Sequence, residues 1–119
     1  MLATVPWTVA RGGLLGLSRS SVVFASDFAT GSIEAVDKAG GPVRHVLTSP
    51  FLFARVDDDN LYWADYAQQG RLERMAIGGG PREVIWEQPA PGYLRDVAFD
   101  ACNVYIGLTN VGQVYARRK

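Results

Sequence analysis

The chain has a single cysteine, a single histidine and no excess of charge of either sign. Among its 119 residues, 12 are basic and 12 are acidic. One cysteine, Cys102, cannot form a disulfide within the chain, so cysteine usage indicates no redox compartment. Apart from Arg117–Lys119 the basic residues are spread out, and balanced charge favours neither a nucleic acid nor an anionic membrane as partner.

Long apolar runs are also missing. No run approaches the roughly 20 residues that a membrane-spanning helix needs, and the amino terminus lacks the basic and apolar regions of a signal peptide. We therefore expect neither a membrane partner nor signal-directed export of this chain, and the cellular compartment stays open. What the sequence does contain is 13 glycines, 6 prolines and many Val, Tyr, Phe and Trp, a composition that favours short strands joined by tight turns.

The strongest pattern is an internal repeat. A shift of 39 positions places Leu61–Ala64 on Val22–Ala25 and Gly79–Pro81 on Gly40–Pro42, with no gap. A third copy follows at a shift of 43 positions, which places 103–105 on 60–62. A period near 40 residues is typical of the blades of a propeller, each of which has four strands.

The repeat divides the chain into four parts of a single all-β domain, residues 1–119. We expect a closing strand in residues 1–12, a first repeat in 13–51, a second in 52–94 and an incomplete third in 95–119. Thr4–Val9 matches the fourth strand of the other repeats, and the third repeat supplies only a first, second and third strand. In strand letters the expected order is D, ABCD, ABCD, ABC.

Second-strand positions carry large apolar side chains in every repeat, namely Phe24, Trp63 and Ile106. Their recurrence predicts packing between neighbouring blades rather than a ligand platform, with Trp63 in the middle blade. Glu34 and Glu73 also recur at one third-strand position, which indicates a structural role for both.

A family resemblance rests on Val56-Asp57, Leu61-Tyr62-Trp63-Ala64-Asp65 and Gly78-Gly79-Gly80-Pro81, with Asp100 and Val104-Tyr105 as partial echoes. These residues resemble the YWTD and related bacterial six-bladed propeller repeats. The resemblance implies a β-propeller of four-stranded antiparallel blades. It does not specify a function, because propellers serve as receptors, lectins, scaffolds and enzymes.

Three blades are too few to close a ring, since propellers have about 4 to 8 blades. Two copies would give six, so we expect a homodimer in which Thr4–Val9 of one chain pairs with Gln113–Arg117 of the other. The alternative is that the sequence is a piece of a longer propeller.

No motif indicates a catalytic residue, a metal or a cofactor. Asp57–Asn60 resembles the start of a calcium loop, but the equivalent segments are turn formers and nothing completes an ion site. His45 lacks Cys or His neighbours, and Cys102 lacks a nearby base. Gly78–Pro81 lacks the Lys-Ser/Thr pair of a phosphate loop and is better explained as a tight hairpin turn.

The candidate binding site is the end of the ring where loops from several blades would gather. Arginine, aromatic and amide side chains there suit carboxylates, sugars or peptide backbones, which makes a protein, peptide or carbohydrate the expected ligand. The candidate residues are Arg11, Asp27, Phe51, Arg55, Tyr66, Gln68, Tyr93, Arg95 and Asn110.

Two functions fit this reading of the sequence. The first is a non-enzymatic binding or interaction module. The second is an enzyme resembling the six-bladed lactonases and related hydrolases, which would need acidic side chains around a metal in the channel. The inner strands offer Asp57, Asp96 and Asp100 for that purpose.

Overall fold

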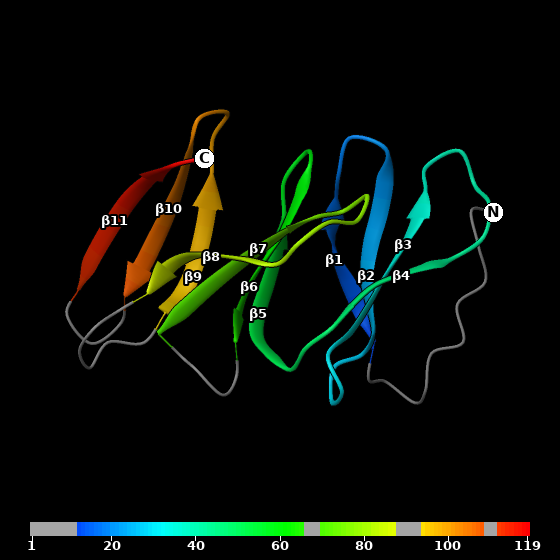
Figure 1. Cartoon of the computed structure of the whole chain (residues 1–119), viewed down its shortest axis with the longest axis horizontal. Helices are drawn as coiled ribbons and strands as arrows, with labels where there is room; N and C mark the ends of the chain where they lie inside the picture. The colour runs from blue at the N-terminus through cyan, green and yellow to red at the C-terminus, as the bar shows by residue number, and fades with distance from the viewer. Residues whose placement is uncertain (1–11, 66–69, 88–93, 109–111) are drawn as a thin grey trace.

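The computed structural model describes residues 12–65, 70–87, 94–108 and 112–119, which form eleven strands in three antiparallel sheets and no helix (Figure 1). Sheet 1 contains β1 (Gly13–Leu17), β2 (Ser21–Asp27), β3 (Ser32–Asp37) and β4 (Arg44–Thr48). Sheet 2 contains β5 (Phe51–Val56), β6 (Asn60–Asp65), β7 (Arg71–Ala76) and β8 (Glu83–Glu87). Sheet 3 contains β9 (Leu94–Phe99), β10 (Asn103–Leu108) and β11 (Gln113–Arg118). The predicted all-β class is confirmed.

Within each sheet the strands lie in sequence order, and each pairs antiparallel with the next. This is the arrangement that short turns allow between neighbouring strands. The first strands of sheets 2 and 3 begin at Phe51 and Leu94, one residue before the repeat boundaries drawn from the sequence. In the described part of the chain, no helix is long and apolar enough to cross a membrane.

The three sheets repeat one another in their backbone hydrogen bonds as well as in sequence. At the turn after the first strand, the N–H groups of Ser18, Asp57 and Asp100 donate to the carbonyls of Ser21, Asn60 and Asn103. Just after the third strand, the N–H groups of Lys38, Ile77 and Lys119 donate to the carbonyls of Ser20, Asp59 and Cys102. Residues 38, 77 and 119 are therefore structural equivalents, and so are residues 18, 57 and 100.

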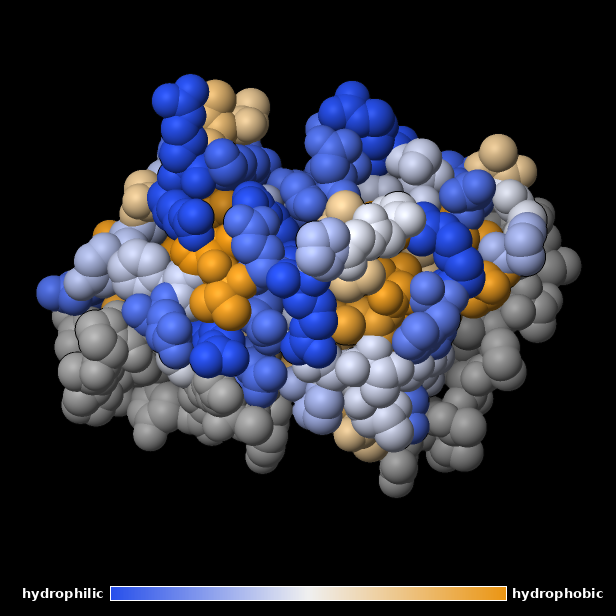
Figure 2. All heavy atoms as spheres, in the orientation of Figure 1, coloured by the Kyte–Doolittle hydropathy of each residue, from blue (hydrophilic) through white to orange (hydrophobic). Residues whose placement is uncertain are grey.

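The sheets lie side by side, and the first strand of the middle sheet, β5, contacts the first strands β1 and β9 of its neighbours (Figure 1). One apolar cluster lies between sheets 1 and 2 and a second between sheets 2 and 3. On the face drawn in Figure 2, orange areas of apolar surface are bordered by hydrophilic side chains. Each sheet interface thus buries its own core.

Alternation along β6 sends its side chains into both cores. Trp63 is fully buried in the cluster with Val23 and Ile33 of sheet 1, as predicted for a second-strand residue. Tyr62 points the other way, into the cluster with Val104 and Ile106 of sheet 3. The middle sheet is therefore buried on both faces along its second strand.

Candidate functional site

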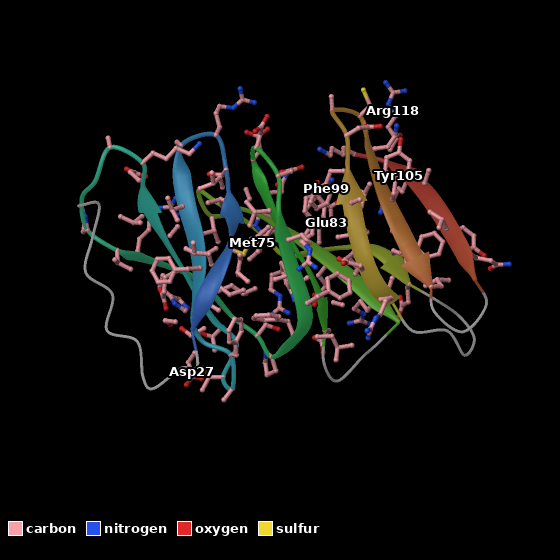
Figure 3. The ribbon with its side chains drawn as sticks, turned by 180° about the vertical axis from the view of Figure 1, so that it is seen from behind. Asp27, Met75, Glu83, Phe99, Tyr105 and Arg118 are labelled. Atoms are coloured by element: carbon pink, nitrogen blue, oxygen red, sulfur yellow. The ribbon has the colours of Figure 1, made fainter. Side chains whose placement is uncertain are left out.

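A cleft of about 1060 Å³ lies at the end of the sheets where the β5–β6, β7–β8 and β9–β10 turns meet Lys119. Figure 3 shows Phe99, Met75 and Glu83 of its lining close together, with Asp27 at the other end of the sheets. The cleft therefore lies at the opposite end of the sheets from the loop that contains Asp27. Asp27 is one of the candidate binding residues.

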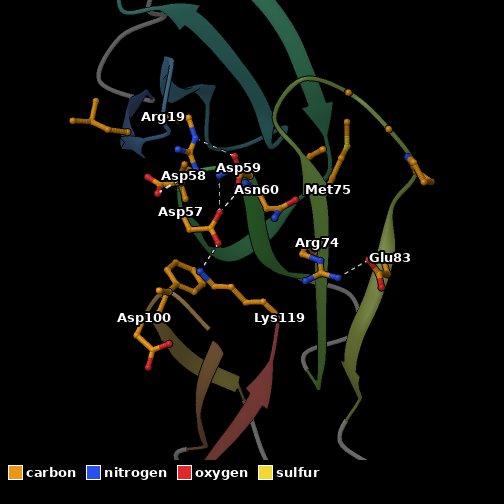
Figure 4. Close-up of a pocket in the computed structure, with 18 residues that line it drawn as sticks. Arg19, Asp57, Asp58, Asp59, Asn60, Arg74, Met75, Glu83, Asp100 and Lys119 are labelled. Atoms are coloured by element: carbon orange, nitrogen blue, oxygen red, sulfur yellow. Dashed lines mark hydrogen bonds and ion pairs between the residues drawn. The ribbon is translucent and has the colours of Figure 1, made fainter. Parts of the chain in front are cut away.

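Asp57 is the most heavily engaged residue of the cleft (Figure 4). Its Oδ1 accepts hydrogen bonds from the backbone N–H groups of Asp59 (3.0 Å) and Asn60 (2.7 Å). Its Oδ2 accepts from the Tyr62 hydroxyl at 3.0 Å and lies 2.8 Å from Lys119 Nζ. Oδ1 closes a turn that the sequence favours, because aspartate readily bonds to backbone two residues on. The turn interpretation is thereby supported over a calcium loop.

These contacts determine how Asp57 and Tyr62 ionise. Burial would raise the pKa of the Asp57 carboxyl, but Lys119 and the backbone N–H groups outweigh it and hold the pKa below 3.8. Burial, together with the negative charge of Asp57, raises the pKa of Tyr62 to about 12. At neutral pH the pair is therefore a carboxylate and a neutral hydroxyl that donates to it.

The Tyr62 ring links sheet 2 to sheet 3. It packs on Phe99 with 4.6 Å between ring centroids, and Lys119 Nζ lies 5.4 Å from the centroid of the same Phe99 ring. A cation over an aromatic face adds to the ion pair with Asp57. At this interface an acid and a tyrosine of sheet 2 thus contact a lysine and a phenylalanine of sheet 3.

Sheet 3 carries the same acid and tyrosine again. Asp100 Oδ1 accepts from the N–H groups of Cys102 and Asn103, both at 2.7 Å, and its Oδ2 accepts from the Tyr105 hydroxyl at 2.6 Å. The bond from Tyr105 and the two backbone bonds lower the pKa of Asp100 to about 2. Among the described residues no cation forms an ion pair with Asp100, whereas Lys119 forms one with Asp57.

The remaining charged groups of the cleft are paired with each other. Arg74 Nη2 lies 2.8 Å from Glu83 Oε2, and Arg19 lies 3.7 Å from Asp58. In the described part of the chain, no three His, Cys, Asp or Glu side chains are grouped so that they could hold a metal ion. Ion pairs join the turns around the cleft, and its charged side chains therefore stabilise the fold.

Of the nine candidate binding residues, Arg11, Tyr66, Gln68, Tyr93 and Asn110 lie outside the described residues. Asp27 Oδ1 accepts from the N–H of Ala29 at 2.8 Å, which closes the β2–β3 turn. The Phe51 ring contacts Phe28 of that turn edge to face, at 6.1 Å. The structure therefore does bring Phe51 and the loop of Asp27 together.

The two described arginines among the candidate residues, Arg55 and Arg95, differ in their contacts. Arg55 Nη2 lies 3.0 Å from Asp96 Oδ2, across the interface between sheets 2 and 3, and Arg55 Nη1 donates to the Ala54 carbonyl. Arg95 is exposed on β9. Of the two, Arg55 serves the contact between sheets, and Asp96 is occupied with it.

No protein-family model and no curated protein matches this chain. Its function has to be inferred from the arrangement of its own residues.

The cleft was not predicted from the sequence. The spacing Asp-x-x-Asn-x-Tyr occurs at 57–62 and again at 100–105, and this second, shorter repeat could have revealed the paired acid and tyrosine. His45 was expected to lack Cys or His neighbours, and in the structure its Nδ1 lies 3.1 Å from Glu34 Oε2, because the two residues pair directly across β3 and β4. Glu73 is paired with Arg82 at 3.1 Å, in keeping with a structural role.

Asp57→Asn should lower the free energy of unfolding at pH 7 by about 2 kcal/mol, the usual value of hydrogen bonds to a charged group. Because the pKa of Asp57 is lower in the folded state than its ordinary 3.8, its contribution is present above pH 4 and is lost as the pH falls through the folded value. The variant should therefore lose less stability than the unaltered chain between pH 7 and pH 3, as measured by urea unfolding at both pH values.

The matched control is Asp58→Asn, whose side chain is exposed and whose ion pair with Arg19 is long. Such surface pairs contribute little, so Asp58→Asn should leave both stability and its acid dependence within about 0.5 kcal/mol of the unaltered chain. Equal acid sensitivity of Asp57→Asn and the unaltered chain would contradict the assignment of Asp57 as a paired carboxylate.

Proposed function

We propose that the three sheets are blades of a β-propeller and that two copies of the chain close a six-bladed ring, which acts as a non-enzymatic binding or interaction module. Support comes from the repeated four-stranded sheets, stacked in sequence order with their first strands adjacent. Repeat units that cannot bury their apolar faces alone gain stability by stacking on neighbours. In the described part of one chain, each end sheet of this array has only one neighbouring sheet.

The observation that carries the proposal is the exposure of residues whose repeat equivalents are buried. Leu72 of sheet 2 is fully buried against sheet 3, whereas its equivalent Val114 in sheet 3 is 74% exposed. At the other end of the array, Leu14 and Leu17 of sheet 1 are 72% and 62% exposed. Apolar side chains that are exposed at both ends of a stack mark interaction surfaces.

The edge of sheet 3 supports the same assembly. Sheets 1 and 2 each have a fourth strand beside the third, but in the described part of the chain β11 has no strand on its outer edge. A free edge offers unpaired N–H and C=O groups to another strand. In the proposed ring Thr4–Val9 of the second copy, which lies outside the described residues, pairs with β11.

The acids that a hydrolase of the alternative type would need are occupied. Asp57 is paired with Lys119 and Asp96 with Arg55, and Asp100 accepts two hydrogen bonds from its own turn and one from Tyr105. This favours the binding module over a metal-dependent enzyme. The proposed ligand is a protein, peptide or carbohydrate at the end of the ring that carries Asp27 and Phe51, where Phe28 and Leu52 add exposed apolar surface.

Light scattering should return about twice the chain mass of 13.0 kDa at micromolar concentration. A stable monomer at that concentration would remove the ring and favour a piece of a longer propeller. Elemental analysis of the same purified sample separates the two functions, because stoichiometric calcium or zinc would favour the hydrolase alternative.

A further inference from the structure

The interface between two sheets is built from four equivalent positions that can be compared around the molecule. The lower-numbered sheet contributes a turn residue at position 18, 57 or 100 and a second-strand residue at 23, 62 or 105. The next sheet contributes the last residue of its first strand, 17, 56 or 99, and the residue just after its third strand, 38, 77 or 119. Register supports the third set, because Leu17, Val56 and Phe99 each pair with the second residue of the following strand.

At the interface of sheets 2 and 3 these positions are polar and aromatic. Asp57 and Tyr62 meet Phe99 and Lys119, with an ion pair of 2.8 Å and a ring contact of 4.6 Å. At the interface of sheets 1 and 2 the same positions hold Ser18 and Val23 opposite Val56 and Ile77. Ser18 and Ile77 are both buried there. The position of Asp57 in sheet 2 is thus held by a serine in sheet 1, and the position of Lys119 in sheet 3 is held by an isoleucine in sheet 2.

Among the described residues of one chain, two halves of such an interface have no match. Sheet 3 carries the acid and the tyrosine, Asp100 and Tyr105, on the face opposite to the buried Ile106. Sheet 1 carries the apolar residue and the lysine, Leu17 and Lys38. Lys38 is exposed and its Nζ donates to the Arg19 carbonyl at 3.2 Å, and Leu17 is exposed beside the cleft.

We propose that these two halves meet between copies of the chain, so that Lys38 of one copy pairs with Asp100 of the other and Leu17 packs on the ring of Tyr105. This interface rests on the proposed six-bladed ring and specifies its residues. The occupant is a second copy because sheet 1 carries a lysine, Lys38, at the position from which Lys119 pairs with Asp57. If the face of sheet 3 were like that of sheet 1, with a serine in place of the acid, we would expect an apolar residue at position 38. A two-fold axis produces the contact twice in each ring.

The charge pattern also gives the contact its direction. If sheet 3 packed on sheet 3 of the second copy, Asp100 would face another acid or a neutral residue, and if sheet 1 packed on sheet 1, Lys38 would face like charge. Repulsion between like charges disfavours packing of a sheet on its own copy. The sheet 3 to sheet 1 contact is thus the one that continues the sequence of sheets already present in the chain.

Chemical cross-linking tests the contact directly. In a background with Cys102→Ser, which removes the only native thiol, Leu17→Cys and Tyr105→Cys are combined and treated with a short bis-maleimide. Residues 17 and 105 lie on sheets 1 and 3, which both contact sheet 2, and a link within one chain would leave a monomer on a denaturing gel, so only the covalent dimer is counted. A covalent dimer should form, and each single variant should form at least about tenfold less.

The matched control combines Thr30→Cys with Tyr105→Cys, since Thr30 is exposed in the β2–β3 turn at the other end of sheet 1. This pair should not cross-link. A dimer by light scattering that cross-links through Thr30 as well as through Leu17, or through neither, overturns the proposed interface while leaving the ring in place. A chain that is monomeric in light scattering overturns the ring itself.

A charge variant tests the ion pair separately from the packing. Lys38→Glu should weaken dimerisation by about tenfold or more, because it places an acid opposite Asp100 at both contacts of the ring. Lys38→Arg keeps the charge and should dimerise within about threefold of the unaltered chain. Equal dissociation constants for Lys38→Glu and the unaltered chain overturn the pairing of Lys38 with Asp100.

Discussion

Trp63→Ala should lower the free energy of unfolding by about 3–5 kcal/mol, the range for truncating a large buried aromatic residue. The side chain is fully buried in the cluster between sheets 1 and 2, and the Arg82 guanidinium lies 5.2 Å from its ring centroid. Its indole nitrogen has no hydrogen-bond partner among the described residues, so the loss comes from packing and the cation–π contact. The variant leaves a cavity where two sheets meet.

Urea unfolding at one fixed protein concentration measures the loss, since the stability of a dimer depends on concentration. Val84→Ala is the control, because Val84 is a large apolar residue of the same sheet whose side chain is substantially exposed. It should cost less than about 1 kcal/mol. A Trp63→Ala loss as small as that of Val84→Ala would place the indole outside the core and contradict the described strand phase.

The strands and their order could be read from the sequence because each repeat presents the same local features. Glycine-rich turns such as Gly79-Gly80-Pro81 separate short apolar stretches, and alternation within a stretch such as 61–65 fixes which side chains face a core. The burial of Trp63 followed from its recurrence with Phe24 and Ile106 at the second strand. Local rules and a period were enough for that part of the fold.

The contacts of the cleft could not be read in this way because they join distant parts of the chain. Lys119 reaches Asp57 only because sheet 3 stacks on sheet 2 and brings the end of β11 beside the β5–β6 turn. Arg55 looked available for a ligand, yet the same stacking places it against Asp96. Which faces touch, and at what offset, is decided by packing between sheets, and no period in the sequence reports it.

Gly31→Ala should lower the free energy of unfolding by roughly 2–5 kcal/mol, from a backbone cost and a steric cost together. Gly31 has φ +71°, a left-handed conformation that suits glycine. A Cβ there would lie 2.0 Å from the Ser49 carbonyl oxygen. Ser49 cannot move away without breaking the hydrogen bond from its N–H to the Gly31 carbonyl, so the β3–β4 edge would open.

Gly112 is the matched position at the start of β11, with φ +59° and no described atom within 4 Å of an added Cβ. Gly112→Ala should therefore cost only the roughly 1–2 kcal/mol of the left-handed conformation in the folded single chain.

In the proposed ring, however, a strand of the second copy lies beside β11 as β4 lies beside β3. That strand brings backbone to the place that Ser49 occupies next to Gly31. Gly112→Ala should then also weaken dimerisation, by about tenfold or more, measured as the dissociation constant in light scattering over a dilution series. Gly79→Ala has a positive φ and equally open surroundings in a turn between β7 and β8, so it should leave dimerisation unchanged. A Gly112→Ala chain that dimerises as tightly as Gly79→Ala would mean that the edge of β11 is not covered, and strand pairing between copies would have to be removed from the proposed ring.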